Sequence, residues 1–186
     1  MKTRYLTKFD EINSLIQTAY QKGTGEERRK SVEDTILDLL VDAYVIGVGM
    51  ASEDFKRKPE YDSYLMYEII YKEIAGEDVT DRIRKHLADD DLPALKTLAE
   101  SEFHRVANES SFKTAEAIAP SGTKTWMTME DEWVRSTHDF LQDVTVGMSD
   151  VFVTWDGDEA LCPGDFSRAE NNVNCRCVLT YRQGSL

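Results

Sequence analysis

Apolar residues recur every three or four positions through the first two-thirds of the chain, which is the spacing of amphipathic helices. The pattern predicts a short helix over 10–22, a loop over 23–30 and a second helix over 31–51. Acidic residues at the start of the second helix are typical of a helix N-terminus. Gly47 and Gly49 lie near its end, where small residues either allow close packing or loosen the helix.

Further helices are predicted beyond Pro59, which interrupts the periodic pattern. They cover 61–74, 80–87 and 93–117. The last of them begins with a proline, a residue that suits the first helical position. The turn residues at 120–122 end it.

Beyond Gly122 the helical periodicity fades and short stretches of β-forming residues appear. The predicted strands cover 124–129, 144–146, 151–155 and 175–181. We therefore predict an α+β fold with a helical body over 1–92. A second unit over 93–186 contains the long helix and a small β-containing lobe.

The composition supports a folded protein of the cytosol. The chain has 186 residues, 41% of them hydrophobic, which is enough for a packed core. No apolar run approaches the roughly 20 residues of a membrane span, and no apolar segment follows the basic residues at the start. The formal net charge of −13 disfavours nonspecific binding to DNA. We expect an acidic, solvated surface, or one that meets a basic or neutral protein.

Cys175 and Cys177, separated by Arg176, pose the main chemical question. The odd number of cysteines and a reducing cytosol argue against a disulfide framework. On a strand the two side chains would also point to opposite faces. With His138 and either Asp131 or Cys162 they would supply a tetrahedral zinc set, which would stabilise a small lobe.

Other interpretations need no metal. In a purely structural network, Asp131 pairs with Arg135 or Arg176, His138 binds a backbone carbonyl, and Asn174 caps a turn. The cysteines then act as small buried apolar residues, and this is the interpretation we favour. A cysteine nucleophile activated by His138, or a redox role for the pair, are the remaining alternatives.

Taken in order, these residues resemble the phage head morphogenesis family, also called the Mu F-like minor head proteins. The shared pattern is Lys-x-Trp-x-Thr, then Asp, then Arg-x-x-His, then Pro-Gly-Asp, then Asn-Cys-Arg-Cys. The matching positions are Lys124, Trp126, Thr128, Asp131, Arg135, His138, Pro163, Gly164, Asp165, Asn174, Cys175, Arg176 and Cys177. The segment SEFHR at 101–105 is similar to the family's helix before this pattern, so the resemblance covers about 95–181. The family usually has Asp-Gly where this chain has Gln142-Asp143.

The resemblance implies a minor head protein of a phage or prophage, acting at the portal vertex in capsid assembly and in DNA packaging or ejection. Its partners would be the portal, scaffold or major capsid proteins, first in the host bacterial cytoplasm and then in the virion head. It implies docking rather than catalysis, so we assign no catalytic residue. We expect the docking surface within 1–92, where Tyr61, Tyr64, Tyr67 and Tyr71 recur at helical spacing, although that spacing also fits a half-buried core.

Two other functions remain open from the sequence. One is a small metal-dependent nuclease or toxin-like enzyme that uses His138 with Asp131 or Glu102. The other is an accessory protein that uses the same fold and its acidic surface to bind one host protein.

Overall fold

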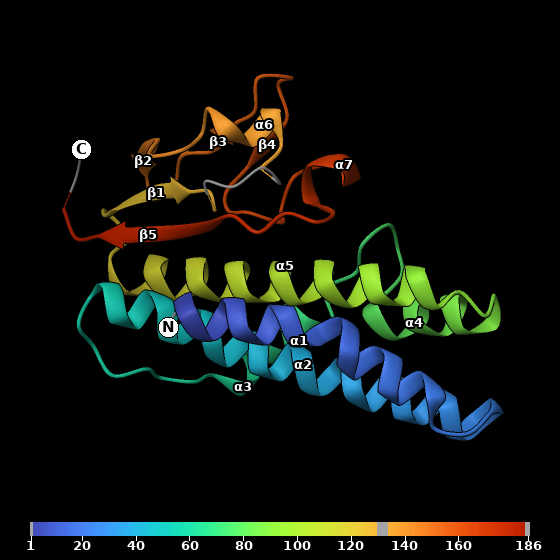
Figure 1. The fold of residues 1–186 in the computed structure, drawn as a ribbon. Coiled ribbons are helices and arrows are strands. Elements are labelled where there is room, and N and C mark those ends of the chain that lie inside the picture. Colours follow the sequence, from blue (N-terminus) through green and yellow to red (C-terminus); the bar gives the residue numbers. More distant parts are fainter. Residues whose placement is uncertain (1, 130–133, 185–186) are drawn as a thin grey trace.

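The computed structural model describes residues 2–129 and 134–184, and it has two layers built on one long helix, α5 (Leu92–Ile118) (Figure 1). Helices α1 (Lys2–Gln21) and α2 (Gly25–Asp54) lie along one side of α5. Strand β5 (Val178–Arg182) runs along its other side. A mainly helical N-terminal body thus carries a small β lobe, and the predicted α+β class is confirmed.

Two short helices, α3 (Ser63–Ile70) and α4 (Val79–Ala88), complete the helical body. Asp62 and Asp78 precede them, and each aspartate side chain accepts hydrogen bonds from backbone amides of the first turn. Asp91 caps α5 in the same way. Each cap satisfies amides that the helix itself leaves without a partner, so the three helix starts are fixed by the sequence.

Helix α1 begins at Lys2, well before the start predicted at residue 10. Tyr5 and Phe9 extend the apolar stripe of Ile12 and Ile16 towards the N-terminus at helical spacing. Tyr5 is fully buried, and its ring lies 5.8 Å from that of Phe103 on α5. The prediction was wrong here because charged and polar residues separate the two aromatic residues along the chain.

Helix α2 begins at Gly25, so the loop predicted over 23–30 is wrong as well. Arg29 forms ion pairs with Glu26 and Glu33, three positions before it and four after it. Such pairs stabilise a solvated helical turn that has no apolar stripe to reveal it in the sequence.

Helix α3 ends at Ile70 rather than at residue 74. Ile74 instead forms a β-bridge with Glu77 across a tight turn. Ala75 and Gly76 make that turn with φ values of 56° and 83°, in the left-handed region that ends regular helices.

The β lobe contains a small antiparallel sheet with β1 (Thr123–Met127) between β2 (Thr145–Gly147) and β5. A separate hairpin pairs β3 (Phe152–Val153) with β4 (Glu159–Ala160). The strand predicted over 175–181 is only partly right, because β5 begins at Val178 and both cysteines of the Cys-Arg-Cys segment precede it.

Helix α5 contributes to two apolar cores. Leu95 and Phe103 join the core of the helical body, whereas Phe112 joins the core of the lobe. The largest side chain of the second core is Trp126, which is fully buried. The predicted domain boundary at residue 92 stays a prediction. Helix α5, which that boundary assigns to the C-terminal unit, also completes the core of the N-terminal helical body.

Helix α2 is long and apolar enough to cross a membrane by length and composition, with a mean hydropathy of 1.5 over its most apolar stretch. The sequence pattern predicted no such segment. However, 67% of this stretch is buried inside the protein. Since the core helix of a bundle needs the same apolar character, this burial accounts for the composition of α2.

Gly47 lets α2 approach α5 closely. A Cβ atom at this position would lie 2.0 Å from the Ser110 hydroxyl oxygen and 2.1 Å from the Ala107 carbonyl oxygen. The carbonyl belongs to the helix backbone and cannot rotate away. At Gly47 the structure therefore supports close helix packing, and not loosening of the helix, as the role of the small residue.

We expect Gly47→Ala to lower the free energy of unfolding by about 2 kcal/mol, because the overpacking cost exceeds the gain in helix propensity. Denaturant unfolding followed by circular dichroism measures the change. Val41→Ala, on an exposed position of the same helix, is the control and should change stability much less. An unchanged midpoint for Gly47→Ala would show that the two helices separate freely.

Candidate functional site

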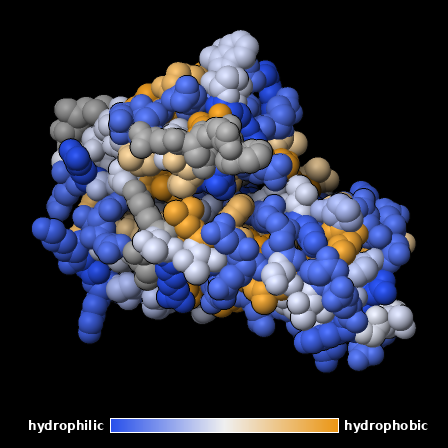
Figure 2. All heavy atoms as spheres, in the orientation of Figure 1, coloured by the Kyte–Doolittle hydropathy of each residue, from blue (hydrophilic) through white to orange (hydrophobic). Residues whose placement is uncertain are grey.

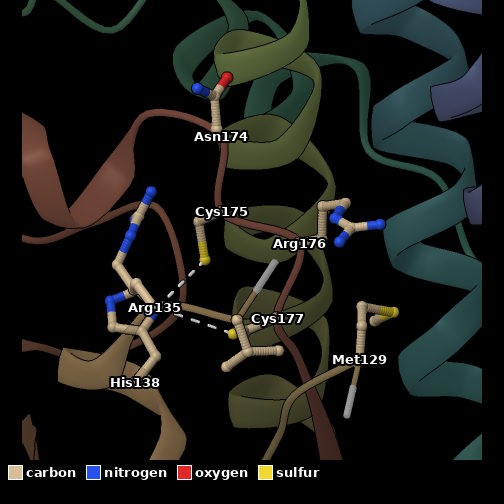
Figure 3. A pocket seen from close by; sticks show the side chains of 8 residues that line it. Met129, Arg135, His138, Asn174, Cys175, Arg176 and Cys177 are labelled. Carbon is tan, nitrogen blue, oxygen red and sulfur yellow. Dashed lines mark hydrogen bonds between the residues drawn. The ribbon is translucent and has the colours of Figure 1, made fainter. Parts of the chain in front are cut away.

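The side chains of His138, Cys175 and Cys177 converge in the β lobe (Figure 3). The Nδ1 atom of His138 lies 3.5 Å from Sγ of Cys175 and 3.7 Å from Sγ of Cys177. All three side chains are buried, with exposed fractions of 1%, 4% and 4%. Residues that lie almost forty positions apart thus form one compact cluster, which we call the thiol–histidine cluster.

Two short helices bring the cluster together. His138 belongs to α6 (Ser136–Asp139), and the Cys-Arg-Cys segment follows α7 (Ala169–Asn172). Asn174 turns the chain between α7 and the cysteines with a φ of 58°. Because the cysteines precede β5, they escape the alternation of a strand, and both sulfurs face His138 (Figure 3). The expectation of opposite faces does not apply.

Aromatic rings hold the imidazole of His138 in place. The His138 ring stacks on Phe166 with centroids 5.3 Å apart and meets the edge of Trp126 at 5.5 Å. Trp126 also packs on Phe152 at 5.1 Å. The ring is thereby oriented with Nδ1 towards the sulfurs. Arg135 adds a hydrogen bond to the Val173 carbonyl, which ties α6 to the turn after α7.

The two thiols influence each other's ionisation strongly. Burial opposes ionisation of Cys175, but hydrogen bonding with Cys177 and the nearby His104 and His138 imidazoles outweigh it and hold the pKa of Cys175 well below its ordinary value. Hydrogen bonding with Cys175, together with burial, raises the pKa of Cys177. The pKa values of the two thiols are therefore shifted in opposite directions.

Lys124 and Cys162 lie in the same lobe but have other surroundings. Lys124 is fully buried, donates a hydrogen bond of 2.8 Å to the Leu161 carbonyl and lies 4.5 Å from the centre of the Phe112 ring. Burial lowers its pKa to about 8. Cys162 is also buried, and burial raises the pKa of its thiol. Among the described residues, Cys162 is not grouped with His138, Cys175 and Cys177, so its role as a fourth ligand is not supported.

Asp165 connects the lobe to the helical body. Its carboxylate lies 3.1 Å from Nζ of Lys72, which also contacts Glu109 at 3.2 Å. The neighbouring Gly164 adopts a φ of 87°, and a Cβ there would lie 3.1 Å from the Cα of Arg105. The Pro-Gly-Asp turn therefore lies directly against α5, and a glycine is what allows the approach.

Three predicted site residues remain, namely Asp131, Asn174 and Arg176. Asp131 lies outside the described residues. Asn174 is exposed and has a left-handed backbone conformation with a φ of 58°, and the predicted side-chain cap stays a prediction. Arg176 is half-buried and extends away from His138 in Figure 3.

Gln142 and Asp143, where the family usually has Asp-Gly, have a defined local structure. Asp143 adopts a φ of 61°, the left-handed conformation that glycine tolerates best and aspartate better than most. The Gln142 side-chain oxygen accepts hydrogen bonds from the amide and the hydroxyl of Thr128, at 2.7 and 2.9 Å. A side-chain acceptor and a left-handed turn are therefore both present at the substituted pair.

Sequence reasoning missed a polar group next to the thiol–histidine cluster. His104 is buried on α5, and its Nδ1 lies 2.7 Å from the hydroxyl of Tyr5 on α1. Asn108, one turn further along α5, donates a hydrogen bond of 3.3 Å to the Cys177 carbonyl. No signal in the sequence pairs these residues, because 99 positions separate Tyr5 from His104 and 69 separate Asn108 from Cys177.

Asp158 is a second missed residue, and it organises the loop before α7. The carboxylate is 4% exposed and accepts hydrogen bonds from the amides of Glu159, Ser167 and Arg168, from the Ser167 hydroxyl and from the Asn171 amide group. Burial opposes its ionisation, but these donors lower the pKa of Asp158 to about 2. Its place in the turn sequence Asp-Gly-Asp was the only available signal.

Glu102, a candidate catalytic residue in the nuclease alternative, forms ion pairs with two arginines. Its carboxylate lies 2.9 Å from Arg82 and 2.8 Å from Arg105, and the side chain is 3% exposed. Arg105 also donates a hydrogen bond of 2.9 Å to the Ile69 carbonyl at the end of α3. Since Glu102 and His138 are both buried, neither side chain is presented to a nucleic acid in this structure.

Comparison with known proteins gives one result. The family model described as phage Mu protein F like protein matches residues 67–180. No curated protein and no solved structure matches the chain. The match covers more than half of the chain and begins earlier than the predicted resemblance at about 95. The chain belongs to the phage Mu protein F-like family, which makes it a phage head morphogenesis protein.

The left-handed turn at Asn174 predicts opposite effects for two substitutions. We expect Asn174→Gly to leave the free energy of unfolding unchanged or slightly higher, because glycine adopts this conformation without strain. Asn174→Val should lower it by about 1–2 kcal/mol, because a β-branched residue is strained there. Chemical denaturation of both variants tests the pair. Equal stability of the valine and glycine variants would contradict the assigned role.

The hydrogen bonds to Asp158 predict a pH dependence. Because the folded-state pKa is lowered to about 2, the carboxylate stabilises the fold above its ordinary pKa, and this contribution is lost as the pH falls towards about 2. We expect Asp158→Asn to cost about 2 kcal/mol near neutral pH. The difference from the wild type should shrink as the pH falls from about 5 to about 3. Glu159→Gln, on the exposed neighbour, should show neither effect.

Proposed function

We propose that the protein is a minor head protein of a phage or prophage that docks on the portal, or on a scaffold or capsid protein beside it, during head assembly. Membership of the phage Mu protein F-like family supports the head role. On this proposal the protein assembles in the host bacterial cytoplasm, ends in the virion head and assists DNA packaging or ejection. Its working part is a docking surface.

The exposed tyrosines in α3 and just before it are the observation that carries the docking proposal. Tyr61, Tyr64 and Tyr67 have exposed fractions of 56%, 71% and 61%, and Tyr71 is partly buried against the core. The Tyr67 and Tyr71 rings lie 4.6 Å apart. Tyrosine is enriched at protein interfaces because a large apolar ring and a polar hydroxyl act together. We call Tyr61, Tyr64 and Tyr67 the tyrosine surface.

A groove borders the tyrosine surface. It has a volume of about 750 Å³ and runs between the segment before α3 and the C-terminal part of α5. Tyr61 and Leu65 line one side, and Lys113 and Ala117 line the other. A groove of this size next to exposed aromatic rings offers a partner both shape and apolar contact.

The charge of the protein determines which partners fit. The formal net charge is −13, and Figure 2 shows mostly hydrophilic side chains over the helical body, with apolar atoms in separate patches. An acidic protein is attracted to a basic protein surface and repelled by DNA. Binding to the partner should therefore weaken at high salt, and direct contact with DNA is disfavoured.

A binding experiment with the purified portal protein of the same phage or prophage tests the proposal. We expect the variant with Tyr61, Tyr64 and Tyr67 all changed to serine to bind at least about tenfold more weakly, because loss of interface anchors costs 2 kcal/mol or more. Trp155→Ser is the matched control, since Trp155 is 69% exposed and lies in the turn between β3 and β4, in the β lobe and not in the helical body.

Three outcomes distinguish the alternatives. Binding that depends on the tyrosine surface and weakens with salt supports docking in the head. No binding to portal, scaffold or capsid protein, with capture of one host protein instead, would assign the chain to an accessory role. Binding that is lost in Trp155→Ser and retained in the tyrosine variant would move the docking surface to the lobe.

A further inference from the structure

The thiol–histidine cluster has the donor atoms and the spacing of a tetrahedral zinc site. Zinc bonds of about 2.3 Å to sulfur and 2.0–2.1 Å to nitrogen imply N···S separations of about 3.6 Å around a tetrahedral ion. The structure has N···S separations of 3.5 and 3.7 Å, and all three donor atoms lie within 4.8 Å of one another. We infer that His138, Cys175 and Cys177 bind a zinc ion, independently of the docking function.

Hydrogen bonding alone accounts poorly for the arrangement. In a neutral imidazole each ring nitrogen carries either one lone pair or one N–H, so Nδ1 of His138 can make a hydrogen bond in a single direction. Two sulfurs nevertheless lie at nearly equal distances from this atom. A cation between the three atoms interacts with all of them at once, and thiolate with imidazole is a donor set that zinc prefers.

The cluster borders a cavity of the right size. This cavity has a volume of about 10 Å³, which is close to the space that one water molecule needs. Its walls include Met129, Arg135 and Asn174 besides the three donor residues. Among the described residues, only His138, Cys175 and Cys177 group as ligands here. The described residues thus supply three ligands, and the cavity lies beside them.

Neighbouring groups hold the donors before any ion arrives. Phe166 and Trp126 fix the His138 ring, and Asn108 holds the backbone at Cys177 through its carbonyl. Such outer contacts keep ligands in position and reduce the cost of ordering them on binding. Because all three donor residues are buried, an ion bound by them would be largely shielded from solvent.

The ion would stabilise the β lobe. The described strands of the lobe are short, and Cys175, Cys177 and His138 all come from segments outside its sheet. A zinc ion would link α6 to the chain after α7 and close a long loop, which would add a cross-link beside the small apolar core around Trp126.

Metal analysis of the full chain, purified without a polyhistidine tag under reducing conditions, tests the inference. We expect one zinc per chain after added zinc is removed by gel filtration. Cobalt substitution should give the sulfur-to-metal absorption and the visible bands of a tetrahedral site. Chelation should lower the melting temperature of the wild type.

Three variants and a control locate the site. Cys175→Ser, Cys177→Ser and His138→Gln should each lower zinc affinity at least tenfold and remove the effect of chelation on the melting temperature. Cys162→Ser, which removes a buried thiol outside the cluster, should retain one zinc per chain. If the ligand variants fail to fold, zinc content and the cobalt spectrum of the wild type decide alone.

Three results would contradict the zinc site. A wild type that binds neither zinc nor cobalt overturns the inference, as does equal loss of zinc in Cys162→Ser. Recovery of a Cys175–Cys177 disulfide from reducing buffer, seen as a mass loss of two hydrogens, would replace the metal site with a redox pair.

Discussion

The burial of α5 between two layers is the constraint on which the rest of the structure depends. A helix covered on both sides must pair its buried polar groups within the protein, and α5 does so for the charges of Glu102 and Arg105 and for the amide nitrogen of Asn108. Arg105 is the most connected of them, since it contacts Glu102, Glu109 and the Ile69 carbonyl. Removing one partner from such a group leaves a buried charge uncompensated, which costs far more than a surface pair contributes.

The lobe takes its position from this helix. The Pro-Gly-Asp turn contacts α5 through Gly164 and reaches Lys72 through Asp165, while Asn108 of α5 holds the carbonyl of Cys177. Both the Pro-Gly-Asp turn and the Cys-Arg-Cys segment of the lobe therefore contact α5. A shift of α5 would move the Cys-Arg-Cys segment relative to His138, so the geometry of the thiol–histidine cluster is a consequence of helix packing as much as of the lobe's own strands.

The sequence predicted what depends on local periodicity and on motif order. The long helix, the α+β class and the family followed from apolar spacing and from residues such as Trp126 and His138. What failed depended on contacts across the chain. Residues 2–9 are helical because Tyr5 packs on α5, and Cys175 lies outside a strand because Asn174 turns the chain just before it. Partners so distant in sequence leave no periodic signal.

The limits of the family match separate the two proposed sites. The match spans residues 67–180. It therefore includes Glu102 and Arg105 of α5, the Pro-Gly-Asp turn and the thiol–histidine cluster. Tyr61 and Tyr64 fall outside it, and Tyr67 stands at its first position. A buried framework constrains each of its residues through packing, whereas an exposed surface is free to suit a particular partner. The family model thus covers α5 and the β lobe, whereas the tyrosine surface lies at the border of the match, where under the docking proposal it would give this chain its own specificity.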